Sequence, residues 1–262
     1  MRAIDEINIR APTRGNRKLE KLLAAVNSDL QIKAWWHAAG VNAERLDMSD
    51  HSWVHIQIVT NIALRLSRLL FRRGIEPSVV KDHGMTERDA EVVIAAGALL
   101  HCLGMAIHRT DHERYSLFLA ADKLPALLAD AYDDPERTLI AAESMHAIIS
   151  HRTQGKPITV EGAIVRVADA LDMAQGRARV PFEAGHANIH SLSAYAIEDV
   201  TISAGRDKAV RVEIAMSNSA GIFQVDEGLG SKLRGTLLEE HFEVVARIDA
   251  EHEKRLVSVF RL

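Results

Sequence analysis

Several residue types are scarce in this sequence, and each scarcity excludes a class of protein. One cysteine among 262 residues rules out an internal disulfide and suits a reducing cytoplasm. Aromatic residues make up only 5% of the chain, and the formal charge of −4 argues against a broad nucleic-acid-binding surface. Residues 1–14 lack the apolar core of a signal peptide, and no run of about 18 apolar residues occurs. We therefore expect a cytoplasmic protein with no membrane segment.

Histidine is the residue that the chain has in excess. Eight of its thirteen histidines lie between positions 51 and 151. Residues 91–115 begin as an almost uniformly apolar helical run, which is typical of a helix buried on all sides. His101, Cys102 and His108 follow at its end, and His112 comes shortly after. Because burying such groups without partners costs several kcal/mol, the cluster indicates a bound metal.

The periodicity of apolar residues divides the chain into three parts. Residues 1–45 read as an arm followed by a helix that packs on the main body. Residues 46–180 form the main domain, and apolar residues at helical spacing predict successive helices over 51–71, 86–101, 110–125, 134–151 and 160–174. Thr86 and Asp89 form a capping box, and Thr159 caps the last of these helices.

From about residue 180 the pattern changes to a period of two. Alternation at Val200 and Ile202, and again at Val210, Val212 and Ile214, predicts two strands joined through residues 205–208. A helix over 224–238 and strands over 242–248 and 255–262 follow. The fold class is therefore mainly α, an all-helical domain followed by a small α+β domain of ββαββ order over residues 181–262.

Five candidate ligands come from different helices or helix ends: His55, His101, His112, His151 and Asp169. Each sits on or beside an apolar face, so the helices that carry them converge if they share one core. Asp169 lies within IVRVADALDM, where apolar neighbours on both sides argue against a solvated surface. Imidazole and carboxylate are good ligands for Mn, Fe, Zn or Ni.

At these positions the sequence resembles the HD-domain metal-dependent phosphohydrolase superfamily. The matching pieces are His55 in HIQIV, His101 in ALLHCLG and Asp169 in RVADALD, within residues 50–179. The resemblance implies an all-helical domain with one or two divalent ions, held by His55, His101 and Asp169 and, for a second ion, by His112 and His151. Mg joins the candidate metals on this basis.

The sequence departs from the family pattern at one position. The residue after His101 is Cys102, where the family has an aspartate that commonly bridges or anchors the metals. Thiolate is a softer ligand that suits Zn or Fe better than Mg or Mn. Three outcomes remain open: a site with Cys102 as a ligand, a one-metal site on His55, His101 and Asp169, or no metal and no catalysis.

The chemistry that the resemblance implies is hydrolysis of a phosphate ester, with a nucleotide or related compound as substrate. Arg109 and Arg152 stand beside candidate ligands and are expected to bind phosphate, followed by Arg177 and Arg179, while His108 is placed to donate a proton. The alternative is a catalytically degenerate protein of the same type that binds or senses a nucleotide. The exposed edges of a small sheet also suggest a homodimer. Binding of nucleic acid by that sheet has little support, because its strands lack stacking aromatics.

Overall fold

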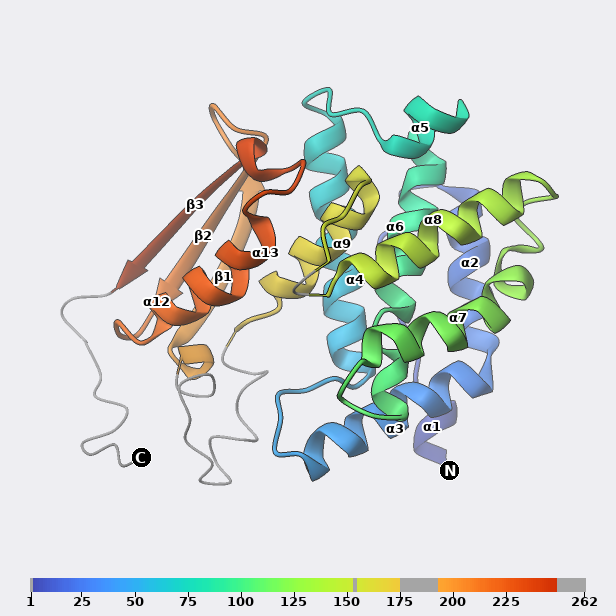
Figure 1. The fold of residues 1–262 in the computed structure, drawn as a ribbon, viewed down its shortest axis with the longest axis horizontal. Helices are drawn as coiled ribbons and strands as arrows, with labels where there is room; N and C mark the ends of the chain where they lie inside the picture. Colours follow the sequence, from blue (N-terminus) through green and yellow to red (C-terminus); the bar gives the residue numbers. More distant parts are fainter. Residues whose placement is uncertain (1, 153–154, 175–192, 249–262) are drawn as a thin grey trace.

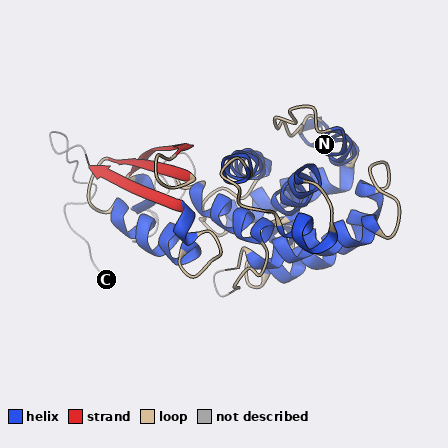
Figure 2. Cartoon of the chain, turned by 90° about the horizontal axis from the view of Figure 1, so that it is seen from above, coloured by secondary structure: helices blue, strands red, loops and turns tan. Residues whose placement is uncertain are grey.

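The fold is a helical body with a small sheet at one end, as expected from the sequence. The computed structural model describes residues 2–152, 155–174 and 193–248. Figure 2 shows the strands gathered at one end of the molecule and the helices filling the rest. Buried apolar residues from Ile7 to Phe242 form a continuous core. The mainly α class, with an α+β segment at the end, is confirmed.

Helix α6 (Glu87–Leu100) is the central element of the body. It contacts α4 (Trp53–Phe71), α8 (Glu136–Ser150) and α9 (Val160–Leu171), and nearly all its residues are buried. It begins with the capping box that the sequence predicted between Thr86 and Asp89. Residues Glu87–Ala106 are long and apolar enough to cross a membrane, but 89% of that window is buried inside the fold. The burial of this segment is that of a helix in the core of the fold.

The remaining helices surround this centre. They are α1 (Arg2–Asp5), α2 (Arg17–Ser28), α3 (Leu30–Arg45), α5 (Ser78–His83), the 3₁₀ turn η1 (Leu103–Ala106) and α7 (His112–Leu128). The start of the chain is more than a surface arm, since Ile7 and Ile9 are buried. Helix α3 was not predicted from the sequence. It packs on η1 and α4 and buries Trp36, whose indole donates a hydrogen bond to Leu99 O at 3.1 Å.

The C-terminal part is a three-stranded sheet with one interrupted helix. Strand β1 (Ile197–Ala204) pairs antiparallel with β2 (Val210–Met216), and β2 pairs parallel with β3 (Phe242–Ile248). These three strands match the predicted ones. The fourth predicted strand, over 255–262, lies outside the described residues. The order β1, β2, helix, β3 is confirmed as far as the structure describes it.

The helix between β2 and β3 differs from the prediction. It runs through α12 (Gly221–Phe223), the π-helical η2 (Gln224–Gly230) and α13 (Ser231–Leu233), and the 3₁₀ turn η3 (Glu239–His241) follows. The predicted end at residue 238 is wrong because Arg234 leaves the helical conformation and Gly235 takes φ 71°, a left-handed value that terminates a helix. The helix also starts three residues earlier than expected.

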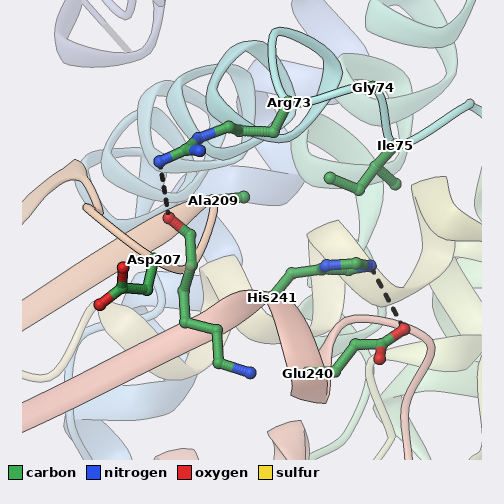
Figure 3. Close-up of a pocket in the computed structure, with 8 residues that line it drawn as sticks. Arg73, Gly74, Ile75, Asp207, Ala209, Glu240 and His241 are labelled. Atoms are coloured by element: carbon green, nitrogen blue, oxygen red, sulfur yellow. Dashed lines mark hydrogen bonds and ion pairs between the residues drawn. The ribbon is translucent and has the colours of Figure 1, made fainter.

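Arg73 joins the helical body to the hairpin between β1 and β2. Its Nη2 donates hydrogen bonds to Gly205 O at 2.6 Å and Arg206 O at 2.7 Å, and it lies 3.4 Å from Lys208 O. Arg73 and His241 both line a cleft of about 460 Å³. Figure 3 shows the guanidinium on one side of this cleft, with a dashed line to a backbone oxygen of the hairpin. The sheet is thus tied to the body at the end of α4, next to α9 (Figure 1).

Candidate metal centre

The six predicted ligands meet at one end of the helical body. His55 lies in the first turn of α4, His101 and Cys102 follow α6, His112 begins α7, His151 follows α8 and Asp169 lies in the last turn of α9. All six are buried, with exposed fractions between 0% for His101 and 8% for Asp169. Residues separated by more than a hundred positions in the sequence are therefore assembled into one cluster.

Gly104 brings α7 against the turn that carries His101 and Cys102. A Cβ at this position would lie 2.0 Å from His112 O, so any other residue would push the two segments apart. Ser116 secures the same contact by accepting from Gly104 N at 2.8 Å and donating to His101 O at 2.6 Å. This close approach places the His112 ring beside Cys102.

The first group of ligands is formed by His55, His101 and Cys102. The two imidazole Nε2 atoms are 3.2 Å apart, and Cys102 Sγ is 4.0 Å from His55 Nε2. Asp169 Oδ1 adds a carboxylate oxygen, 3.4 Å from His55 Nε2 and 3.7 Å from His101 Nε2. Two imidazoles, a thiol and a carboxylate thus converge on one small volume.

The second group is formed by Cys102, His112 and His151, so the thiol belongs to both groups. His112 Nε2 and His151 Nε2 are 3.3 Å apart. The rings of His101 and His151 are in edge contact, with centroids 4.9 Å apart, which links the two groups. Cys102 therefore occupies the position of a bridging ligand between two potential ion sites.

The hydrogen bonds on the far side of each ring turn the Nε2 atoms inward. His55 Nδ1 pairs with Asp172 Oδ2 at 2.6 Å, His101 Nδ1 donates to Ala98 O at 2.7 Å, and His151 Nδ1 donates to Ile148 O at 2.5 Å. An imidazole that donates from Nδ1 presents its Nε2 lone pair. A carboxylate or carbonyl behind the ring is the usual support of a metal-ligating histidine.

The spacing of these atoms fits shared coordination. Two nitrogens that each lie about 2.1 Å from one ion, at tetrahedral or octahedral angles, are about 3.0–3.4 Å apart. The observed separations of 3.2 and 3.3 Å fall in that range. Facing lone pairs repel each other unless a cation or a proton lies between them. The buried groups could therefore hold a metal ion.

The charges of the cluster are strongly coupled. Burial favours a neutral ring, but the Cys102 thiolate and Asp169 outweigh it and raise the pKa of His101 to about 9. Burial likewise opposes ionisation of Cys102, yet the His101 charge and hydrogen bonds from neighbouring imidazoles hold the thiol pKa well below its usual value. The pKa of Asp169 is also lowered against the effect of burial, first by Lys232. The site thus favours anionic thiolate and carboxylate.

A cleft of about 250 Å³ opens onto the ligands. Its walls come from distant parts of the chain: Ser49 and His51 before α4, Arg109 and Glu113 around the start of α7, and Gln224, Gly228 and Lys232 from η2 and α13. Lys232 Nζ lies 2.5 Å from Asp169 Oδ2. The opposite oxygen of that carboxylate faces the His55 and His101 pair.

The other predicted site residues separate into three groups. Arg109 lines the cleft, with Nη1 2.8 Å from His112 Nδ1. His108 and Arg152 do not line the cleft: His108 is exposed and accepts a hydrogen bond from Thr110 N at 3.0 Å. The expected role of His108 as proton donor has no support from this position. Arg177 and Arg179 lie outside the described residues.

Sequence reasoning missed three residues of the site. Asp172, three residues after Asp169, was not assigned as the partner of His55, whose Nδ1 it contacts. His51 was not assigned to the site, although it lines the cleft and its ring centroid is 5.5 Å from that of His55. Lys232 carries no local signal, because only the tertiary fold brings it to Asp169. The available indications in the sequence were the four-residue spacing of His51 and His55 and the three-residue spacing of Asp169 and Asp172.

Comparison with known proteins places the chain in a family. It is 38% identical over 207 residues to "Uncharacterized protein MJ1020" of Methanocaldococcus jannaschii, an alignment that covers 79% of this chain and 80% of the relative. The chain belongs to the same family as MJ1020. No family model matches the sequence, and no solved structure matches it.

Proposed function

We propose that this protein is a metal-dependent phosphohydrolase or phosphodiesterase of the HD type, acting on a nucleotide or related phosphate ester. The observation that carries the proposal is the pair of buried ligand groups that share Cys102 Sγ. Asp169 lies beside the first group, and the cleft above them contains the cations Arg109 and Lys232. Buried metal ligands next to a cleft that offers two cations suit the binding and hydrolysis of a phosphoryl group.

His55, His101, Cys102 and Asp169 would hold one ion, and Cys102, His112 and His151 a second. A divalent ion so held lowers the pKa of a coordinated water and takes up charge on phosphoryl oxygens. A thiolate shared by both groups favours Zn or Fe over Mg. The bridging role proposed for Cys102 replaces that of the aspartate in the HD pattern.

The side chains of the cleft supply the remaining functions. Arg109 presents a guanidinium, whose planar fork matches two phosphoryl oxygens. Lys232, in α13, adds a second cation to the wall of the cleft. His51 takes over the proposed role of His108 as proton donor, because it lines the cleft whereas His108 is exposed. Its Nδ1 is fixed by Ser49 O at 2.6 Å.

The test combines metal analysis with hydrolysis of generic phosphate esters. Purified protein should contain Zn or Fe, and it should cleave p-nitrophenyl phosphate or bis-p-nitrophenyl phosphate. His101→Ala should lose both properties, whereas His37→Ala, at an exposed position in α3, should retain them. Cys102→Ala should lower the metal content, and Cys102→Asp should restore it with a shift toward Mn or Mg. Wild-type protein that holds no metal under any loading condition would contradict the proposal.

A second candidate is a protein that binds a nucleotide without cleaving it. It is favoured by the Lys232 ammonium, which already neutralises Asp169 from within the chain. Calorimetric binding of a nucleotide, with no hydrolysis by the metal-loaded protein or by Cys102→Asp, would support this candidate over the enzyme.

A further inference from the structure

A second polar cleft lies at the opposite end of the α4 and α6 pair. Its volume is about 260 Å³. Four arginines line it together with two glutamates, an asparagine and an aromatic ring: Arg14, Arg68, Arg72, Arg88, Glu87, Glu91, Asn16 and Phe71. None of these residues takes part in the metal centre.

The cleft has an excess of positive charge. Both oxygens of Glu91 are already engaged, Oε1 by Arg68 Nε at 2.6 Å and Oε2 by Asn16 Nδ2 at 3.0 Å. Arg14, Arg72 and Arg88 are exposed and have no ion pair within the described part of the chain. Four guanidinium groups thus face two carboxylates, in a protein whose formal charge is −4.

Arg68 contributes an unsatisfied donor to this cleft. Its side chain is only 10% exposed, and its Nη2 is buried without a hydrogen-bond partner among the described residues. Leaving a charged donor buried and unpaired is energetically unfavourable. Most buried polar groups have a partner, so an orphaned guanidinium nitrogen indicates an acceptor that binds there.

We propose that this cleft binds a phosphorylated small molecule. Guanidinium groups form paired hydrogen bonds with phosphate oxygens, and the excess of two positive charges suits a polyanion better than a single carboxylate. The N-terminal ends of α2 and α6 both reach the cleft, at Asn16 and Glu87, and add partial positive charge. Because Arg68 Nη2 is buried, a ligand reaches it only if the exposed side chains of Arg72 or Arg88 move aside on binding.

This site is separate from the metal centre. Arg88 and His101 are thirteen residues apart at the two ends of α6, which corresponds to about 20 Å at 1.5 Å per residue. The same number of residues separates His55 from Arg68 along α4. A phosphate bound by these arginines therefore does not contact the ligands of the centre.

Titration calorimetry of the full chain, freed of metal by chelation, tests the proposal with pyrophosphate as probe. We expect saturable binding that the variant Arg72→Ala/Arg88→Ala weakens by about tenfold or more, because the charged hydrogen bonds of two guanidinium groups to phosphate oxygens are lost. Both positions are exposed, so the variant should fold. The matched control Arg65→Ala/Arg206→Ala removes two exposed arginines that do not line the cleft and should bind normally.

A second control distinguishes the two phosphate-binding clefts. Arg109→Ala/Lys232→Ala alters the metal centre and should leave pyrophosphate binding by the arginine cleft unchanged. Loss of binding in this variant, equal affinities of the wild type and Arg72→Ala/Arg88→Ala, or no saturation by millimolar pyrophosphate would each overturn the proposal. Titrations with inorganic phosphate and adenosine diphosphate then show which class of phosphate compound the arginine cleft prefers. Tighter binding of either compound than of pyrophosphate also supports the proposal.

Discussion

At the scale of single residues, the geometry of the candidate metal centre depends on the groups that hold its histidine rings in place. His55, His101 and His151 each have a fixed partner for Nδ1, and the Nε2 atoms therefore point toward one another. Two of these partners are backbone carbonyls, which a side-chain substitution cannot remove. Asp172 is the exception, since it supports His55 through a carboxylate. Mutation of Asp172 can therefore test whether the orientation of the His55 ring matters for metal binding.

We expect Asp172→Ala to lower metal affinity about 10- to 100-fold, the usual effect of removing a partner of a ligating histidine. His55 would lose both its orientation and the charge that makes its Nε2 a better ligand. Competition with a chromophoric chelator measures the affinity directly. Asp122→Ala, at an exposed position in α7, is the control and should bind metal like the wild type. Unchanged affinity in Asp172→Ala would mean that other contacts orient His55.

The predicted ligands that the fold brings together share one property. His55, His101 and Asp169 lie on or next to apolar helical faces. An ionisable side chain at such a position needs a buried polar partner, and the sequence pattern therefore identifies it. Asp172 was harder to assign because it lies just past α9, with ψ 68°, where helical phase no longer predicts direction. Whether these groups bind metal in solution stays a prediction, but their convergence is established by the distances.

At the scale of elements, α6 sets how closely the helices pack. Gly97 lies where α8 and α9 both approach α6, and a Cβ there would lie 2.8 Å from Ala147 Cβ and 3.2 Å from Val165 Cγ2. Apolar periodicity predicted this helix because it is long and buried. It did not predict α3, in which Gly40 and the buried Lys33 interrupt the apolar stripe. Lys33 is accommodated by donating to Asp5 O at 3.1 Å, a tertiary contact that has no local signature.

We expect Gly97→Ala to destabilise the protein by about 1–3 kcal/mol through overpacking, although alanine gains about 1 kcal/mol in helix propensity. Urea denaturation monitored by circular dichroism gives the free energy of unfolding. Adding Ala147→Gly should recover part of the loss, because it removes the nearest atom. If Gly97→Ala alone had a larger free energy of unfolding than the wild type, the three helices could move apart without losing packing energy.

Asp89 at the start of α6 should make stability depend on pH. Its oxygens accept hydrogen bonds from Lys18 Nζ at 2.6 Å, Tyr132 Oη at 2.8 Å and Thr86 Oγ1 at 2.7 Å. Burial opposes ionisation of Asp89, but Lys18 and the hydroxyl donors together lower its pKa below the usual value. A carboxyl group whose pKa is lower in the folded state stabilises the fold above its unfolded pKa. That contribution is lost as the pH falls through the folded value.

We therefore expect Asp89→Asn to lower the free energy of unfolding by about 1.5–3 kcal/mol at neutral pH, the range for hydrogen bonds to a charged group. The difference from the wild type should narrow as the pH falls below the ordinary aspartate pKa. Urea denaturation at several pH values measures it. Asp82→Asn, at an exposed position in α5, should differ little from the wild type throughout. A difference that does not depend on pH would exclude the charge of Asp89 as its cause.

At the scale of the whole molecule, the C-terminal part completes the site that the helical body begins. Arg166, one turn before Asp169, donates to Lys232 O at 2.9 Å and also to the carbonyls of Ser150, the last residue of α8, and of Gly155 beyond it. One side chain thus holds the segment after His151 and the segment of Lys232 against α9. The sequence predicted the strands of this part from their alternation. It could not predict their docking, because that depends on contacts between residues more than sixty positions apart.

Lys232 should stabilise the metal-free protein and compete with the metal, since its ammonium and a bound cation share the charge of Asp169. We expect Lys232→Met to lower the melting temperature of chelator-treated protein, because a buried carboxylate loses its counter-ion. The rise in melting temperature on adding Zn should be larger in the variant, since a ligand that binds the folded state stabilises it according to its affinity. Lys81→Met, exposed in α5, controls for the loss of a positive charge. A smaller rise in Lys232→Met than in the wild type would show instead that Lys232 orients Asp169 for metal binding, and the ammonium would then be a positioning group rather than a competitor.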